Sequence, residues 1–230
     1  MNTKNAPVIT IDGPSGSGKG TLARALSKRL TWHLLDSGVI YRAIAWAVGN
    51  ADIAFDKDLV ALELFLKQLD ISIVSSKPGG PTCVLCNNED ITGAIRTISC
   101  STEASNLSAL PIVRDAVLQY QRNFRRAPGL VTDGRDMGTV VFPNASLKFY
   151  LDANIDARAE RRFQQLQTSR INVSLGEVRQ ELSARDYQDQ NRAVAPAKVP
   201  NDAFLIDTTS LSVNQVANRA MDLVKAHDLL

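Results

Sequence analysis

The chain has 230 residues, enough for one large α/β domain or for a core with a modest insertion, and its 44% hydrophobic and 22% charged residues are usual for a soluble globular protein. Its net charge of only +2 excludes the broad basic field that drives non-specific binding to nucleic acids, and no run approaches the ~18 apolar residues of a membrane helix. Three cysteines and the absence of a signal-peptide pattern predict a cytoplasmic protein with no nucleic-acid or membrane partner.

Arginine outnumbers lysine by 17 to 9. A guanidinium presents a rigid fork of N–H donors that fits phosphate and carboxylate oxygens, so the excess favours a phosphate ligand. A bias in the base composition of the gene would give the same excess, and composition alone leaves both explanations open.

Five short apolar runs end in aspartate, and each is followed by a stretch with helical spacing or a turn. The runs are VITID ending at Asp12, HLLD at Asp36, GLVTD at Asp133, KFYLD at Asp152 and AFLID at Asp207. Such runs are typical of the buried strands of a parallel sheet. Ligands bind beyond the carboxyl ends of these strands, so some of the aspartates should line one cleft. We expect Asp152 and Asp207 to cap the helices that follow them instead.

After the first run, the stretch IDGPSGSGKGT matches the phosphate-binding pattern G-x-x-x-x-G-K, with Gly13 and Gly18 before Lys19. Glycines let backbone N–H groups turn inward around an anion, the lysine reaches the outer phosphates, and the next helix directs its positive end at them. Gly20 stands where the strict pattern has Ser or Thr, so Thr21 is the candidate Mg²⁺ ligand. A strand-to-helix turn that binds no nucleotide is the alternative, but the context favours a nucleoside triphosphate. The predicted ATP-binding residues are Gly13, Pro14, Ser15, Gly16, Ser17, Gly18, Lys19, Gly20 and Thr21.

Between the second and third runs, the alternation of strand and helix is interrupted. Residues 57–69 have helical spacing, the stretch DISIVSSKPGGPTCVLCNNEDITG predicts a small antiparallel sheet, and helical spacing then returns with a break near Pro111. We expect one domain, with a core of residues 6–40 and 111–225 and an inserted subdomain of about 41–110. The two cysteines of CVLC lie on a predicted strand, and we interpret them as structural rather than as half of a zinc site.

Four further stretches are more specific than the glycine-rich loop. They are LLDSGVIYR, ASNLSALPIVR, DGRDMGTVVFP and RDYQDQNRAVAP. With the GKGT form of the loop, they resemble the signature blocks of the bacterial cytidylate kinases, which are P-loop nucleoside monophosphate kinases, from about residue 6 to 224. The resemblance implies a three-layer α/β P-loop NTPase fold with a five-stranded parallel sheet in the order 2-3-1-4-5. It also implies an inserted antiparallel subdomain that binds the acceptor nucleotide, and a short helical lid at about residues 154–170.

Polar residues after two strand ends have chemistry suited to an acceptor nucleotide. Ser37 and Arg42 could hold a phosphate monoester, although a helix cap and a surface arginine would give the same pattern. In DGRDMG, Arg135 suits a phosphate, Asp136 can accept a hydrogen bond from the exocyclic amino group of cytosine, and Asp133 is placed to hold Mg²⁺. A turn with a structural ion pair is the alternative for this stretch.

Arg185, Asp189 and Arg192 share one helix face, a pattern that by itself is usual for a solvated ion-pair ladder. The resemblance implies instead that the first two bind the ribose hydroxyls and Arg192 the acceptor phosphate, and that Ser105 and Arg114 read the cytosine edge. The gaps of the stripe hold Tyr and Gln residues, where related chains are often more charged. The residues expected to bind CMP are Ser37, Arg42, Ser105, Arg114, Arg135, Asp136, Arg185, Asp189 and Arg192.

Arg158, Arg161 and Arg162 follow one another at helical spacing in DARAERRFQQL. The resemblance implies that arginines of this lid reach the transferring phosphates and the adenine, while a surface ladder with Glu160 is the alternative. Alignment and positive charge supply most of the catalysis in phosphoryl transfer, and an acceptor phosphate needs no general base. The predicted catalytic residues are Lys19, Arg135, Arg158, Arg162 and Arg192.

The function that the resemblance implies is transfer of the γ-phosphoryl group of ATP to CMP or dCMP, with Mg²⁺ as cofactor. Nothing in the sequence demands more than a monomer, and we expect one. A regulatory GTPase would need the guanine-binding pattern N-K-x-D, which does not occur in the sequence. A kinase for a small hydroxyl acceptor would need a carboxylate base, for which Asp36 is the candidate. The set of polar residues above fits a nucleotide acceptor better.

Overall fold

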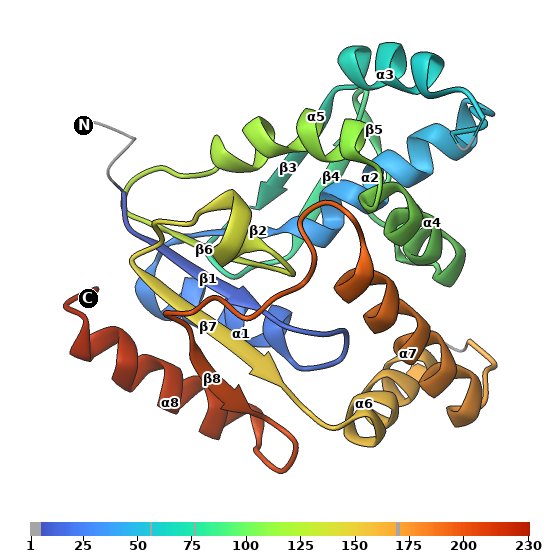
Figure 1. The fold of residues 1–230 in the computed structure, drawn as a ribbon. Coiled ribbons are helices and arrows are strands. Elements are labelled where there is room, and N and C mark those ends of the chain that lie inside the picture. Colours follow the sequence, from blue (N-terminus) through green and yellow to red (C-terminus); the bar gives the residue numbers. More distant parts are fainter. Residues whose placement is uncertain (1–5, 56, 76, 169–170) are drawn as a thin grey trace.

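The computed structural model describes residues 6–55, 57–75, 77–168 and 171–230. At its centre is a parallel sheet of five strands in the order β2-β6-β1-β7-β8. The strands are β1 (Val8–Asp12), β2 (His33–Asp36), β6 (Leu130–Gly134), β7 (Leu147–Asp152) and β8 (Phe204–Asp207). Counted among themselves in chain order, these strands give the sequence 2-3-1-4-5, so the predicted order is confirmed. Figure 1 shows β1 and β7 pointing toward the pair of helices α6 and α7.

Helices cover both faces of this sheet, because side chains alternate along each buried strand. In β1, Val8 packs in one hydrophobic cluster, while Ile9 and Ile11 pack in the other. The first cluster includes side chains of the helices α2 (Ser37–Asn50), α4 (Ile98–Ser108) and α5 (Pro111–Arg122). The second includes side chains of α1 (Lys19–Leu30) and α8 (Val213–Ala226). The three-layer α/β architecture is therefore confirmed.

The segment between α2 and α5 departs from the parallel pattern and forms the upper part of Figure 1. It contains a three-stranded antiparallel sheet in the order β3-β4-β5, as the turn signals predicted. Its elements are α3 (Leu59–Gln68), β3 (Ile71–Ser75), β4 (Thr82–Cys86), β5 (Glu89–Asp90), a 3-10 turn (Ala94–Arg96) and α4. The predicted break is confirmed too, because Pro111 occupies the first turn of α5, where its missing N–H is not needed. All three cysteines are free thiols, two of them on β4.

The remaining helices α6 (Ile155–Thr168) and α7 (Leu175–Asn191) pack on one another beside the strand ends (Figure 1). They bury a small hydrophobic cluster of their own, formed by Ala159, Leu166, Val178 and Leu182. Residues 169–170, at the end of the expected lid, lie outside the described residues. Among the helices that the structure describes, none is long and apolar enough to cross a bilayer.

The prediction that Asp152 and Asp207 cap the following helices is wrong. Asn154 and Ser212 do this instead, each accepting a hydrogen bond from the backbone N–H three residues later. The two aspartates accept from N–H groups only one and two residues later, and so stabilise the turns that leave the strands. Each helix begins a few residues beyond the end of its strand, so the residue directly before the helix, and not the strand-end aspartate, is in position to cap it.

Candidate active site

The glycine-rich loop turns the chain from β1 into α1, as the sequence predicts. Gly13, Gly16 and Gly18 have φ angles of 144°, 78° and 95°, which side chains rarely adopt. A Cβ at Gly13 would lie 2.0 Å from the carbonyl oxygen of Leu151, and one at Gly16 would lie 3.0 Å from that of Arg158. The loop therefore passes directly over the backbones of β7 and α6. No side chain caps the N-terminus of α1, so its first N–H groups face the loop.

Lys19 lies at the start of α1 with its side chain buried. Its Nζ donates a hydrogen bond of 2.9 Å to the carbonyl oxygen of Pro14, which places the ammonium inside the loop. Burial, with the nearby charge of Arg135, lowers the pKa of Lys19 to about 7. The charged form thus lacks a full counter-charge, and an anion in the loop would supply one.

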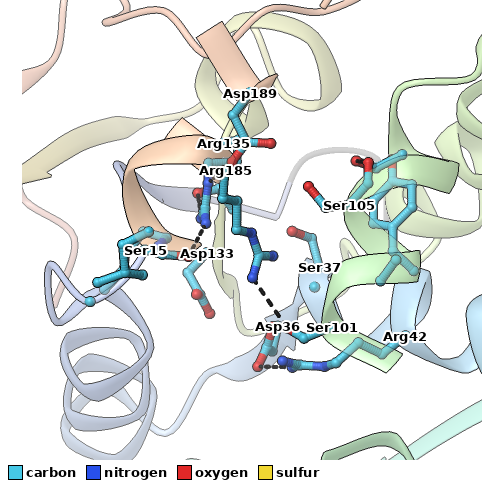
Figure 2. A pocket seen from close by; sticks show the side chains of 18 of the residues that line it. Ser15, Asp36, Ser37, Arg42, Ser101, Ser105, Asp133, Arg135, Arg185 and Asp189 are labelled. Atoms are coloured by element: carbon cyan, nitrogen blue, oxygen red, sulfur yellow. Dashed lines mark hydrogen bonds and ion pairs between the residues drawn. The ribbon is translucent and has the colours of Figure 1, made fainter. Parts of the chain in front are cut away.

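Beside the loop is a polar cavity of about 220 Å³, between α2, α4, the end of β6 and α7. Figure 2 shows its polar side chains converging from these elements, with Ser105 on the opposite side from Ser15 and Asp133. All nine residues predicted to bind the acceptor line this cavity, together with Lys19 and Arg162. The structure thus brings together side chains that lie as far apart in the sequence as Ser37 and Arg192.

One end of the polar cavity is organised around Asp136, whose side chain is 4% exposed. Its carboxylate pairs with Arg114 and, at 3.5 Å, with Arg192. Arg114 also donates to the carbonyl oxygen of Ser108 at 3.1 Å and lies over the ring of Tyr41. The carboxylate is therefore held in a fixed position, and it offers only acceptor atoms.

A second ion pair joins α7 to the glycine-rich loop. Arg135 Nε donates to Asp189 at 2.7 Å, and its Nη2 donates to the hydroxyl of Ser15 at 2.7 Å. Burial raises the pKa of Asp189, but the charges of Arg135 and Arg185 outweigh this and hold the pKa below its usual value. Arg135 is thus fixed between the loop and the acceptor side of the cavity.

Several buried polar atoms around the cavity have no hydrogen-bond partner within the described residues. They include Nε of Arg42, Nε of Arg185, Nη2 of Arg192 and Oδ1 of Asp133. Native proteins satisfy nearly all buried polar groups, so such atoms indicate ligands. Three guanidinium donors fit an anion, and the carboxylate oxygen fits a cation.

The candidate Mg²⁺ ligands lie on two neighbouring cavities. Asp133 lines the polar cavity, and its pKa is raised to about 7 by burial and by the charge of Asp36, so a cation beside it would be stabilising. A Cβ at Gly20 would lie 3.7 Å from Asp133 Oδ2, which leaves room between loop and carboxylate. Thr21 lines the second cavity rather than the first. The described residues contain no group of three or more His, Cys, Asp or Glu side chains placed to hold a metal.

The second cavity, of about 510 Å³, lies along the start of α1 and is called here the α1 cavity. It shares Gly16 and Lys19 with the polar cavity. Its walls include the apolar side chains of Leu211, Val213 and Val216. The glycine-rich loop therefore stands between a polar compartment and a more apolar one.

The sequence and the fold of this chain are similar to those of known proteins. A sequence model of the family described as cytidylate kinase matches residues 9–226. The chain belongs to the cytidylate kinase family. A cytidylate kinase of Coxiella burnetii is 53% identical over 98% of this chain and 95% of its own length, and one of Pseudomonas fluorescens is 48% identical over 100% and 99%. A solved shikimate kinase from Acinetobacter baumannii has a TM-score of 0.50 at 16% identity, covering 99% of this chain and 97% of that one, which shows a shared fold.

The arginines of α6 occupy three different positions in this cytidylate kinase fold. Arg162 lines the polar cavity, whereas Arg161 donates to the hydroxyl of Thr208 at 3.1 Å. Arg158 lines neither the polar nor the α1 cavity. Its buried guanidinium donates to the carbonyl oxygen of Ser15 at 3.1 Å and pairs with Asp186 at 2.6 Å. Arg158 thus joins α6, α7 and the glycine-rich loop.

Two residues near the site were not among the predicted site residues. Asp12 is completely buried, and its carboxylate accepts hydrogen bonds of 2.9 and 2.8 Å from the N–H groups of Met137 and Gly138. These bonds hold the turn that carries Arg135. Gln188 on α7 accepts a hydrogen bond from Ser105. Asp12 was recognisable as a strand-end aspartate. No sequence pattern indicates that it would bond to the turn after β6, or that Gln188 would bond to Ser105.

Proposed function

We propose that the chain catalyses transfer of the γ-phosphoryl group of ATP to CMP or dCMP, giving ADP and CDP or dCDP. The observation that carries the proposal is the convergence of all nine expected acceptor residues on one cavity beside the glycine-rich loop. Membership of the cytidylate kinase family over residues 9–226 gives the same reaction class.

The donor is held by the loop and the start of α1. Backbone N–H groups of the glycines surround the β- and γ-phosphates, and Lys19 places its ammonium among them. The adenosine lies in the α1 cavity, whose apolar walls include Leu211 and Val216. These contacts leave the γ-phosphoryl group facing the polar cavity, because Gly16 and Lys19 border both spaces.

The acceptor is held by guanidinium groups with buried N–H donors that make no hydrogen bond within the described residues. Arg42 and Arg192 bind the phosphate of CMP, and Arg185 with Asp189 binds the ribose hydroxyls. At the other end, Asp136 accepts from the exocyclic amino group of cytosine, while Ser105 and Arg114 read the rest of its edge. The acceptor phosphate oxygen then attacks in line with no general base.

Charge around the transferred group comes from fixed side chains. Arg135 is positioned by Asp189 and Ser15, so its charge is aligned before transfer begins. Asp133 and Thr21 would hold Mg²⁺ together with water and phosphate oxygens, and the ion would neutralise charge on the β- and γ-phosphates. Asp36, the candidate base of a hydroxyl kinase, pairs with Arg42 at 3.5 Å and serves better as its counter-ion.

The division into core, insertion and lid belongs to the same proposal. Residues of about 41–110 contribute Arg42 and Ser105 to the polar cavity, and residues of about 154–170 contribute Arg162 to the same cavity. Closure of both parts over bound substrates would exclude water, which otherwise competes as acceptor.

The proposal is tested by ADP release from Mg-ATP by the purified protein, with no acceptor and then with CMP, dCMP, UMP, AMP or GMP. Negligible release without acceptor and a steep rise with CMP and dCMP are expected. Omission of Mg²⁺ should abolish the rise. Release that no nucleotide accelerates would contradict the proposal, even if ATP binds.

A further inference from the structure

Ser105, on the wall of the polar cavity, has a defined hydrogen-bond direction. Its hydroxyl donates to Oε1 of Gln188 at 3.1 Å. The amide of Gln188 is oriented in turn by Asn106, because Nε2 donates to Oδ1 of Asn106 at 3.2 Å. In this arrangement the oxygen end of the Gln188 amide faces Ser105 and its nitrogen end faces Asn106.

This arrangement decides what Ser105 can offer a ligand. A serine hydroxyl has one proton, and here that proton is directed to Gln188. The lone pairs of Oγ are left for the cavity, where Ser105 is only 6% exposed and Arg114 and Asp136 line the same space. Asp136 also presents acceptors alone, since its proton-free oxygens pair with Arg114 and Arg192.

Two acceptor groups on one wall suit a base that presents a donor. Cytosine carries an amino group at its 4-position, where uracil carries a carbonyl oxygen. If an acceptor oxygen of the protein faces the uracil carbonyl, neither oxygen has a hydrogen bond and the two repel each other. This unfavourable contact discriminates against uracil more strongly than the loss of one favourable contact would.

We propose that Gln188 is a positioning residue for base selectivity: by taking the proton of Ser105, it fixes that hydroxyl as an acceptor and disfavours uracil. The inference rests on the proposed function and names a residue that sets its substrate choice. Gln188 does not line the polar cavity, so it acts only through Ser105. A residue at this position that could only donate would turn the hydroxyl proton toward the base and weaken the preference.

The experiment compares kcat/KM for CMP and UMP in variants of α7. Gln188→Glu keeps an acceptor for Ser105, and exposed Asn106 can turn its amide to donate instead. Gln188→Leu removes the acceptor, and Gln188→Lys replaces it by a donor. The matched control is Gln190→Leu, an exposed position two residues along the same helix.

The CMP-to-UMP ratio should be retained in the Glu and control variants and should fall by roughly 3- to 10-fold in the Leu and Lys variants. The KM for ATP should stay unchanged throughout. In a Ser105→Ala background, Gln188→Leu should have no further effect on the ratio, because the mediating hydroxyl is gone.

Two results would overturn the inference while leaving the proposed function intact. One is a wild-type enzyme that phosphorylates CMP and UMP with equal efficiency. The other is a wild-type ratio in both Gln188→Leu and Gln188→Lys, with each variant folded by its thermal melting profile. Failure of the proposed function would differ from both, because the wild-type protein would then show no CMP-stimulated release of ADP.

Discussion

The substitution Asp12→Asn should change both the pH dependence of stability and the binding of CMP. The carboxylate is fully buried and accepts two backbone N–H bonds, from Met137 and Gly138. Burial raises its pKa from 3.8 to about 6, against the lowering effect of those two bonds. Between these values the folded protein keeps a proton that the unfolded chain has released. This raised pKa contributes stability that is fully present below about pH 4 and is lost as pH rises through about 6.

The magnitude follows from the size of the shift. Two pKa units correspond to about 3 kcal/mol, of which about 2 kcal/mol is lost between pH 4.5 and pH 7. Asparagine does not titrate, so the free energy of unfolding of Asp12→Asn minus that of wild type should rise by about 2 kcal/mol over this interval. All other titrating groups are shared, and their contributions cancel in the difference.

Urea unfolding at pH 4.5, 5.5, 6.5 and 7.5 measures this difference, with Asp222→Asn on the exposed face of α8 as control. A difference that stays constant with pH would refute the argument that burial keeps the proton on Asp12. The same variant also tests whether Asp12 positions the acceptor site, because the turn that Asp12 holds carries Arg135 and Asp136. The KM for CMP should rise more than the KM for ATP, and equal changes in both would contradict that role.

Three further substitutions have expected outcomes that follow from single observations. Lys19→Ala should lower kcat on the order of 100-fold or more with every acceptor, as measured by ADP release. Urea unfolding of this variant should show no loss of stability, because the substitution removes a poorly solvated charge. Gly13→Ala should lower the free energy of unfolding by at least about 2 kcal/mol, since its Cβ would lie 2.0 Å from the oxygen of Leu151, whereas Gly18→Ala, with nothing within 4 Å, should cost only about 1 kcal/mol. Arg192→Ala should reduce kcat/KM for CMP by roughly 10- to 100-fold and leave the KM for ATP nearly unchanged. An unaltered kcat/KM would mean that the buried pairing of Arg192 with Asp136 is structural only.

Much of the fold could be predicted because its determinants are local. A strand buried on both faces needs a continuous apolar run, and VITID and KFYLD are such runs. The glycine-rich loop was recognisable because positive φ angles and close backbone approach tolerate almost no other residue. The break at Pro111 likewise follows from the chemistry of one residue.

The partners of the charged side chains could not be predicted in this way. Arg135 and Asp189 are 54 positions apart in the sequence, and nothing in either segment specifies the other. Arg158 illustrates the consequence: helical spacing groups it with Arg161 and Arg162, yet each guanidinium has a different environment. Ion pairs depend on where whole elements pack, and a residue's chemistry alone leaves several partners open.

The charge balance of the polar cavity connects its structure with its chemistry. Its lining holds seven Lys and Arg side chains against five Asp and Glu side chains. Burial, together with the charge of Arg135, lowers the pKa of Arg185 to about 10, so the cationic groups destabilise one another before any ligand binds. A phosphate group relieves this repulsion and satisfies the unpartnered donors at the same time. The repulsion between these cationic groups is therefore already present in the folded protein before substrate binds. The side chains need not reorganise when negative charge develops during phosphoryl transfer.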